Sequence, residues 1–466
     1  AAGETPSPEM VAAAAETGAI SRRLAMAMFA SIVIGLIAIS WQAQSRLIST
    51  LRKPPEVFID RAEEIAKHAG ETAQMRDEVH WFVFDRSTKP GTLRFVSRRA
   101  PSRMTPRESV QPSNDVFIFQ TGRVTMTDPP LVPGASVIVL DAKGALVEYR
   151  AFSTGGAAGA SLATPDRGTT TRNSSSTFVS QTIELVLMLV TTVAAIVAAR
   201  RSLRRGRGDR VGALRVAVYA GVCLFVAWFV AAHHATDPQE EARLLSGGLG
   251  QACASALVLW LFYIALEPGV RRLWPRSLIG WTRLLAGRFR DAMVARELLF
   301  GIALGILAHE VFWISTMIRL RAGTIGGFFA SVDGVQPLSI FLGDQLVSHV
   351  QAIEIPIGIA FTLLLARKAF SKIGGYLALS LFFVAYGMFL PATGIYLALV
   401  LVAIVRSGLL TGVATGVTLS LLAGTPLTLD TDAWYWPRAL VVLLLVAAAA
   451  AWTARDAARH QPSFST

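Results

Sequence analysis

Cysteine and charged residues are scarce in this sequence. Of its 466 residues only Cys223 and Cys253 are cysteines, and both lie inside apolar runs. A disulfide framework is therefore excluded, and no cysteine and histidine spacing typical of a zinc site is present. Charged residues make up 16% of the chain and hydrophobic residues 53%, with a mean hydropathy of +0.48. This composition is too apolar for an ordinary soluble protein and indicates a polytopic membrane protein.

Sequence motifs of nucleotide-dependent and hydrolytic enzymes are also absent. The chain contains no G-x-x-x-x-G-K-[ST], H-R-D or D-F-G motif, so the phosphate-binding loop and the metal-binding aspartate of phosphoryl transfer are missing. It contains no H-E-x-x-H or G-x-S-x-G motif either. We therefore expect no catalytic residue, cofactor or metal site in this chain, and an intramembrane enzyme has no motif to support it.

The net charge of +12 would suggest nucleic-acid binding in a soluble protein. Here the arginines lie in short segments between apolar runs, where the positive-inside rule makes them cytoplasmic. The densest group, from Arg200 to Arg210, directly follows an apolar run. We therefore expect a lipid bilayer with anionic phospholipids as the partner, and no nucleic acid. No cleavable signal peptide is visible, because the first apolar run is long enough to span a membrane.

The apolar runs predict about ten spans with both termini cytoplasmic. The predicted fold class is a polytopic α-helical membrane protein, with a small extracytoplasmic α+β domain inserted between the first and second spans. The predicted parts are a cytoplasmic linker (1–23), a first transmembrane helix (24–43), the α+β domain (44–152), a flexible tether (153–177), three transmembrane helices (178–266), a basic cytoplasmic segment (267–297), a C-terminal transmembrane bundle (298–453) and a cytoplasmic tail (454–466). The predicted spans are 24–41, 178–199, 211–232, 250–266, 298–318, 352–365, 375–390, 395–405, 409–422 and 439–452. The stretch 319–351 is predicted as an apolar loop broken by glycines, in which a short re-entrant or interfacial piece remains open.

The polar part of the chain predicts one helix followed by strands. Pro54-Pro55 starts the helix and Gly70 stops it, with Phe58, Ala62, Ile65 and Ala69 on one face. The predicted strands lie at 81–84, 93–96, 115–120, 135–140 and 145–152, and the turn Asp141-Ala142-Lys143-Gly144 joins the last two.

The basic segment 267–297 is interpreted as a helix in the membrane surface. From Leu278 its apolar residues recur at helical spacing, with arginines on the opposite face, and such a helix inserts its apolar side among acyl chains. A surface helix that merely joins two spans remains the alternative. The apolar positions are Leu278, Trp281, Leu285, Phe289 and Met293, and the opposite face carries Arg283, Gly287, Arg290 and Asp291. The candidate residues for lipid headgroups or cytoplasmic regulation are Arg271, Arg272, Arg283, Arg288, Arg290 and Asp291.

The same segment carries a family resemblance. Leu266-Glu267-Pro268, Trp274-Pro275 and Arg283-Leu284-Leu285-Ala286-Gly287-Arg288 resemble the membrane-embedded C-terminal region of bacterial transmembrane serine/threonine protein kinases. The opening residues from Ala2 to Ala12 resemble the linker that follows the kinase domain in that family. The resemblance implies a bacterial cytoplasmic membrane, and a kinase domain that would bind ATP and Mg²⁺ upstream of Ala1. Because the first residue is alanine, we expect a fragment or a processed product.

His309-Glu310 is the candidate intramembrane polar site. Both ionisable residues fall near the middle of the span 298–318, where they are expected to face protein or water. Gly301, Gly305 and His309 share a small, polar face that we expect to meet another helix. A proton relay, a substrate contact and a hydrogen-bonded helix contact remain open.

Three smaller features complete the candidates. Gly412 and Gly416 predict close helix packing. His233-His234 is interpreted as an interfacial cap, with a metal site as the alternative. The aromatic run from Trp434 to Trp436 predicts a belt at the membrane interface.

The function expected from the resemblance is that of a membrane anchor and sensory module, in which the outer domain senses an unknown ligand and signals across the membrane. A homodimer that pairs the first spans is the expected two-state element. The alternative is a stand-alone transporter or a membrane partner subunit, although no inverted repeat is apparent.

Overall fold

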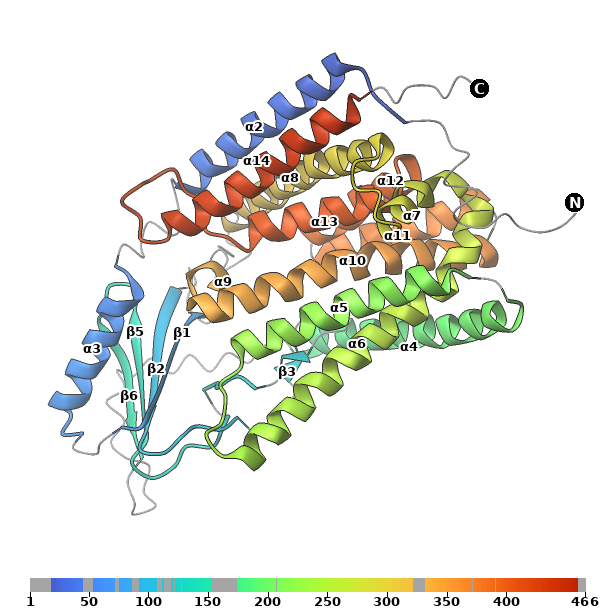
Figure 1. Ribbon diagram of the computed structural model, residues 1–466. Coiled ribbons are helices and arrows are strands. Elements are labelled where there is room, and N and C mark those ends of the chain that lie inside the picture. The colour runs from blue at the N-terminus through green and yellow to red at the C-terminus, as the bar shows by residue number, and fades with distance from the viewer. Residues whose placement is uncertain are drawn as a thin grey trace, which may run out of the picture.

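The computed structural model describes residues 18–44, 53–71, 75–85, 92–106, 111–112, 119–120, 122–126, 128–152, 174–206, 208–321, 332–370, 372–389 and 391–459. Figure 1 shows a bundle of long helices with a small sheet domain at one end. The predicted tether therefore lies almost entirely outside the described residues, as do most of the predicted linker and tail.

The long helices occupy the predicted apolar runs. Six of the described helices are long and apolar enough to cross a membrane: α2 (Arg22–Gln44), α5 (Arg210–Ala231), α6 (Pro238–Leu273), α8 (Ala292–Arg321), α10 (Leu338–Ala369) and α14 (Trp436–Ala457). Four further helices are α4 (Ser174–Arg204), α11 (Lys372–Phe389), α12 (Pro391–Arg406) and α13 (Leu409–Ala423). A mainly helical chain with several candidate membrane spans is therefore confirmed, while the crossings themselves and their number stay a prediction.

Two helices extend well beyond their predicted limits. α6 begins at Pro238 rather than at residue 250, because the Asp237 carboxylate caps it by accepting hydrogen bonds from the N–H groups of Gln239 and Glu240. α10 begins at Leu338, and the short helix α9 (Val332–Val335) precedes it. The predicted loop at 319–351 is therefore wrong for residues 338–351. Glycines were the reason for the loop prediction, yet Gly343 lies inside α10, where it is buried together with Phe341 and Val350.

The predicted α+β domain is a four-stranded antiparallel sheet with one helix on it. Its order is β1-β2-β5-β6, formed by β1 (Asp77–Asp85), β2 (Thr92–Ala100), β5 (Ser136–Asp141) and β6 (Leu146–Ala151). α3 (Pro55–His68) packs on one face, where Phe58 and Ala62 meet Phe82, Phe95 and Ile138. Ile65 is partly buried on this face as predicted, and Ala66 is buried as well, whereas Ala69 follows the end of the helix at His68 and is exposed.

The turns of this domain follow the sequence prediction. Gly70 has a φ of 81° and Gly144 a φ of 87°, a region that favours glycine. The Gly144 N–H donates to the Asp141 carbonyl and closes the hairpin between β5 and β6. A second small sheet pairs β3 (Gln111–Pro112) with β4 (Phe119–Gln120), while most of the strand predicted at 115–120 lies outside the described residues.

The other face of the main sheet is covered by the segment that precedes β5, residues 122–126 and 128–135, called the covering segment below. Val96, Val137 and Val139 are buried there against Met126 and Leu131. Arg98, which is 1% exposed, holds this covering segment by donating from its guanidinium to the carbonyls of Thr125 and Pro129. Burial lowers the pKa of Arg98, which the carboxylate of Asp128 partly offsets. The segment is thereby fixed between the sheet and the helix ends.

Small residues allow close packing within the bundle. A Cβ atom added at Gly301 would lie 2.3 Å from the Cβ of Ala414, and one at Gly305 would lie 2.5 Å from that of Thr418. The predicted small face of α8 therefore meets a helix, which is α13. Gly416 of α13 approaches Ala352 of α10 in the same way, with 3.1 Å for an added Cβ. The predicted glycine contacts are thus confirmed.

Candidate functional site

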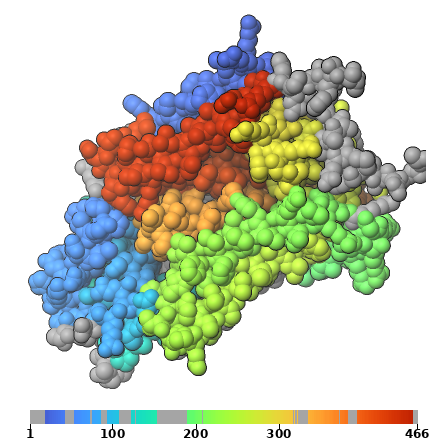
Figure 2. Space-filling model, in the orientation of Figure 1, coloured from blue at the N-terminus to red at the C-terminus, as the bar shows by residue number. Residues whose placement is uncertain are grey.

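A cavity of about 1310 Å³ lies where the sheet domain meets the helix bundle. It is bounded by strand β1, the segment Arg123–Met126, the end of α5 and the beginnings of α10 and α14. In Figure 2 the blue and cyan atoms of the sheet domain lie directly against orange and yellow-green atoms of the bundle. The residues used below that line the cavity are Glu78, Val79, His80, Trp81, Phe82, Val83, Arg123, His233, Gln336, Ile340, Asp344, Val347, Ser348, Gln351, Trp434 and Arg438.

The first connection across this junction is a side-chain amide that bonds to the main chain of β1, as the main chain of a neighbouring strand would. The side-chain amide of Gln336, which lies between α9 and α10, accepts a hydrogen bond from the Phe82 N–H at 3.0 Å. It also donates to the Phe82 carbonyl at 2.7 Å. Both groups are buried, so the two bonds satisfy main-chain atoms that water does not reach. Strand β1 is thereby attached to the segment that starts α10.

A second connection is centred on Asp77, which is 5% exposed. One carboxylate oxygen contacts Arg103 at 3.0 Å, and the other lies 2.8 Å from the His233 Nε2 and accepts from the Met104 N–H at 2.7 Å. Burial by itself would raise the pKa of Asp77, but the hydrogen bonds from His233 and Met104 and the charge of Arg103 outweigh it and lower the pKa. The carboxylate therefore stays ionised between the domain and the end of α5.

His233 and His234 together form the corner between α5 and α6. The His233 N–H donates to the Gly122 carbonyl at 2.8 Å, and the His234 ring contacts Glu241 at 2.7 Å and the Phe229 carbonyl at 2.8 Å. Burial opposes the charged form of His234, but its bonds to Phe229 and Glu241 prevail and raise its pKa. The His234 ring therefore joins the end of α5 to α6 and the His233 ring joins the corner to β1, while the position of this corner at a membrane interface stays a prediction.

The third connection is an ion pair between the covering segment and the bundle. Arg123 contacts the Asp344 carboxylate of α10 at 2.6 Å, and the two side chains are 21% and 12% exposed. The backbone beside it is close-packed: a Cβ atom added at Gly343 would lie 2.7 Å from the Cβ of Ala231. The covering segment, α5 and α10 therefore meet at one point.

Arg438 at the start of α14 closes the opposite side of the cavity. Its guanidinium donates to the carbonyls of Gly334 at 2.8 Å and Gln336 at 2.7 Å. It also lies 5.4 Å from the Phe341 ring centroid and 5.6 Å from that of Trp434. Trp434 in turn packs on the α3 side of the sheet. The aromatic run at 434–436 was interpreted as a membrane belt, yet Trp434 contacts the domain.

Two polar groups on the cavity wall have no hydrogen-bond partner among the described residues. These are the Nδ1 of His80 on β1 and the Nε2 of Gln351 on α10. Burial lowers the pKa of His80, which Glu78 partly offsets, so the ring favours its neutral form. Buried polar atoms of this kind are normally satisfied by water or by a ligand. Both atoms are buried in this structure, so each side chain would have to shift before it meets a molecule in the cavity.

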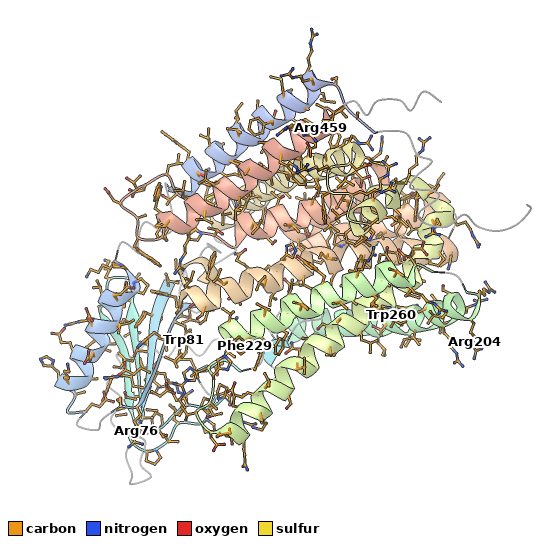
Figure 3. The ribbon with its side chains drawn as sticks, in the orientation of Figure 1. Arg76, Trp81, Arg204, Phe229, Trp260 and Arg459 are labelled. Carbon is orange, nitrogen blue, oxygen red and sulfur yellow. The ribbon has the colours of Figure 1, made fainter. Side chains whose placement is uncertain are left out.

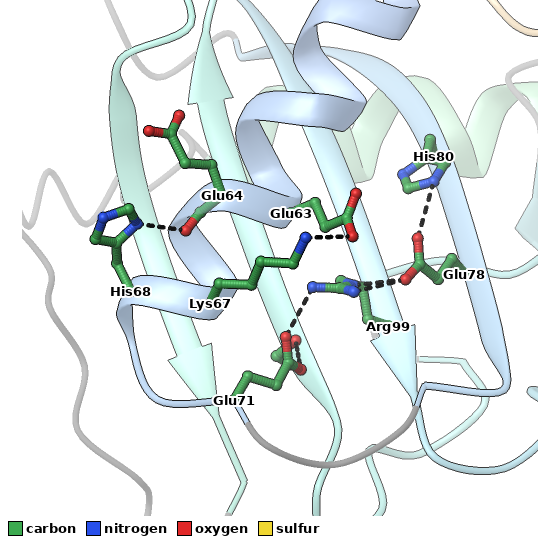
Figure 4. Close-up of polar contacts among 9 residues, drawn as sticks. Glu63, Glu64, Lys67, His68, Glu71, Glu78, His80 and Arg99 are labelled. Atoms are coloured by element: carbon green, nitrogen blue, oxygen red, sulfur yellow. Dashed lines mark hydrogen bonds and ion pairs between the residues drawn. The ribbon is translucent and has the colours of Figure 1, made fainter.

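An ion-pair network fixes the position of β1 behind this wall. Arg99 on β2 contacts Glu71 at 2.8 Å and Glu78 at 2.7 Å, and Glu71 also accepts from the Ser136 hydroxyl (Figure 4). Glu78 and Arg99 are direct partners in the strand register. Since this network joins three strands and the end of α3, the cavity wall is a preorganised surface.

The predicted pair His309-Glu310 lies elsewhere, on α8. Neither residue lines the cavity. The His309 Nδ1 is buried without a hydrogen-bond partner in the described part of the chain, whereas Glu310 does have an interaction partner. The structure therefore does not bring these two residues together with the polar groups at the sheet domain.

The basic segment 267–297 differs from its prediction. Its helix α7 spans only Ile279–Leu285, after a 3₁₀ turn at Pro275–Leu278, and Gly287 with a φ of 81° ends it. Arg283 is 5% exposed and contacts Asp291 at 2.9 Å, so these two candidates cannot reach lipid headgroups. The prediction of one continuous amphipathic helix is therefore wrong. The Arg283–Asp291 ion pair instead stabilises a turn between α7 and α8.

The other candidate arginines of this segment are at least partly exposed to solvent. Arg272, Arg288 and Arg290 are exposed, while Arg271 is half-buried and pairs with Glu267. Figure 3 labels Arg204 and Arg459 at the end of the bundle that is farther from the sheet, and Trp81 on the side of the sheet next to the helices. Binding of anionic lipids by the exposed arginines of 267–297 stays a prediction.

Sequence reasoning missed the polar residues of α10. Asp344, Ser348 and Gln351 recur along one face of this helix and line the cavity, but they had been placed in a loop. Their four- and three-residue spacing is the signal that could have located them. Asp77 and Gln336 carried no signal, since their partners lie far away in the sequence.

No group of three or more histidine, cysteine, aspartate and glutamate side chains within the described ranges could hold a metal ion. Comparison of the chain with models of known protein families, with curated proteins and with solved structures finds no match. The functional assignment therefore rests on the cavity and on the resemblance given by the sequence.

Proposed function

We propose that this chain is a membrane anchor and sensory module, whose sheet domain and helix bundle together bind a ligand. The resemblance to the C-terminal region of bacterial receptor serine/threonine kinases supports a signalling role across the cytoplasmic membrane. In this proposal residues 44–177 are extracytoplasmic and both termini are cytoplasmic, in agreement with the arginines at the far end of the bundle.

The observation that carries this proposal is the shared wall of the cavity. Strand β1 provides one side, and the helices α5, α10 and α14 provide the other. A ligand bound there contacts both parts at once, so its binding free energy depends on how they are docked. A molecule that prefers one docking arrangement shifts the population toward it, which is the physical requirement for a sensor.

α14 supplies a route from the cavity to the N-terminal linker. Its first turn carries Arg438 at the cavity, and at its other end the Ala457 carbonyl accepts a hydrogen bond from the Ile20 N–H at 3.0 Å. A Cβ atom added at Gly18 would lie 2.8 Å from the Cβ of Met293 at the start of α8. A shift of α14 along its axis would therefore displace the point at which an upstream kinase domain attaches.

α2 is positioned to pair with a second copy of the chain. It packs on α8 and α14 through Ala25, Ile32 and Leu36, and lies at the outside of the bundle (Figure 1). Its opposite face exposes apolar side chains, among them Met26 at 60% and Ile34 at 66%. Lipid chains or a second α2 can cover this face. In this proposal a homodimer paired through α2 is the signalling state.

The first test uses the protein from its native membrane. Its intact mass and N-terminal sequence are measured, and its uptake of label from ATP is followed with and without residues 44–152. The proposal expects a native chain that extends upstream of Ala1 and a phosphorylation level that changes on deletion of the domain. A chain that begins at Ala1 and takes up no label, or a deletion without effect under every stimulus, would refute it.

Transport remains the second candidate, because the cavity extends along the polar face of α10. Asp344, Ser348 and Gln351 form this face, and polar residues within membrane helices often mark substrate paths. Uptake of candidate solutes into proteoliposomes, compared between the unmodified chain and the His309→Ala, Glu310→Gln and Asp344→Asn variants, distinguishes the two functions.

A further inference from the structure

The sheet of the α+β domain has a free edge that lines the cavity. β1 is the outermost strand in the order β1-β2-β5-β6. The two bonds from Gln336 show that Phe82 directs both its N–H and its carbonyl away from β2. Because these directions alternate along an antiparallel strand, Glu78 and His80 also direct theirs outward. Within the described residues, no main-chain partner meets these outward groups.

We propose that this edge binds an extended peptide segment of another protein, which pairs with β1 as an additional strand. The inference rests on the proposed function, because it names the ligand class of the same cavity. Addition of a strand to an exposed sheet edge is an established mode of peptide recognition. Gln336 already occupies the position at Phe82 that one residue of such a strand would take.

The length of the free edge sets the length of the peptide. At one end of the edge the Asp77 carboxylate contacts His233 and Arg103, and at the other end the Phe82 main chain bonds to Gln336. From Asp77 to Phe82 a strand rises by about 17 Å, which corresponds to a peptide of about five residues. A cavity of about 1310 Å³ admits such a segment but not the folded sheet domain of a second copy. Edge-to-edge pairing of two copies is thereby excluded at this site.

The chemistry of the wall favours an uncharged peptide. The ionised groups nearest to the edge are already paired, Glu78 with Arg99 and Arg123 with Asp344. Trp81 and Val83 on β1 and Val347 on α10 supply apolar contacts. The polar side chains of Ser348 and Gln351 on α10 line the same cavity and supply sites for polar groups of the peptide. Apolar side chains that alternate with small polar ones match this arrangement, because side chains of a strand alternate in direction.

The test uses the full chain in lipid nanodiscs and a pool of capped pentapeptides of the form acetyl-X-Val-X-Val-X-amide, in which X is Ser, Asn or Gln. The peptide that binds best is then N-methylated at one residue at a time. Methylation at alternate residues is expected to weaken binding about tenfold, while methylation at the residues between them changes it by less than about twofold. On binding, the amide hydrogens of Glu78 and His80 become protected from exchange, and those of Val79 and Trp81 stay as they were.

Two variants at one position separate main-chain pairing from side-chain recognition. His80→Pro removes an outward N–H but no bond to β2, so peptide affinity falls at least tenfold. His80→Ala keeps that N–H and retains most of the affinity. The inference is overturned if no peptide of the pool binds, if the methylation effects lack the two-residue period, or if His80→Pro binds like the unmodified chain. The methylation series needs no protein variant, so it does not depend on the folding of a variant. If any of these three results is obtained, a phosphorylation response to deletion of residues 44–152 would still support the proposed function.

Discussion

Gln336 provides the sharpest test of the docking between the sheet domain and the bundle. Replacement by leucine keeps the approximate volume but removes the two hydrogen bonds to the Phe82 main chain at 3.0 and 2.7 Å. Each buried main-chain group left without a partner costs about 1–3 kcal/mol. Since the two groups are adjacent and a single water can satisfy part of them, we expect a total of about 2–4 kcal/mol.

The amide hydrogen of Phe82 reports this change directly. If exchange requires separation of β1 from Gln336, a loss of about 2–4 kcal/mol accelerates it by roughly 30- to 900-fold. Gln351→Leu is the matched control, because it makes the same substitution on the same cavity, at a side chain whose Nε2 has no partner among the described residues. An unchanged Phe82 exchange rate in Gln336→Leu, or an equal acceleration in Gln351→Leu, would refute the reasoning.

The remaining predictions concern charge, pH and packing. Arg123→Met and Asp344→Asn should each weaken docking, and the double variant should cost less than the sum by about 1–2 kcal/mol in thermal unfolding of the nanodisc-embedded chain, because each single variant already removes the same ion pair between two partly buried side chains. Asp77 has a lowered pKa, so its stabilising contribution is present above its ordinary value of 3.8 and is lost as the pH falls through the lowered one; Asp77→Asn should flatten the stability profile in that acidic range. His234 has a raised pKa, so its contribution to stability is full below pH 6.5 and is lost as the pH rises through the raised value. His234→Ala should abolish this pH dependence. Gly305→Ala should destabilise the bundle by about 1–3 kcal/mol because its Cβ would lie 2.5 Å from that of Thr418, whereas Gly250→Ala, with open space around it, should be neutral or slightly stabilising.

The sequence predicts well those elements that depend on local patterns. The helix Pro55–His68, the hairpin closed at Gly144 and most limits of the apolar helices follow from turn residues and hydropathy. The contacts of Gly301 and Gly305 also follow, because small residues at four-residue spacing form one face of a helix. These features are encoded within about one helical turn or one hairpin of sequence.

Features that depend on distant partners were not predictable in this way. The Arg283–Asp291 pair turned an expected amphipathic helix into a short helix and a turn, although both residues had been seen as polar positions. The cavity itself is formed by β1, α5, α10 and α14. No local sequence pattern predicts the contacts among these elements. His233 was noticed and assigned to a cap, but its partner Asp77 lies in a different part of the chain.

The length of α10 explains how polar residues of the cavity can belong to a membrane helix. Its 32 residues extend for about 48 Å, which exceeds a hydrocarbon core of about 30 Å. If α10 crosses the membrane as proposed, Arg367 and Lys368 mark one boundary, where Arg367 lies 4.6 Å from the Trp274 ring centroid, as expected of interfacial anchors. Counted back from there, the core ends about 20 residues earlier, near Val347. Asp344 and its partner Arg123 then lie outside the hydrocarbon, where an ion pair is not penalised as it would be in lipid. The cavity can therefore be polar and open to water while α10 remains a membrane helix.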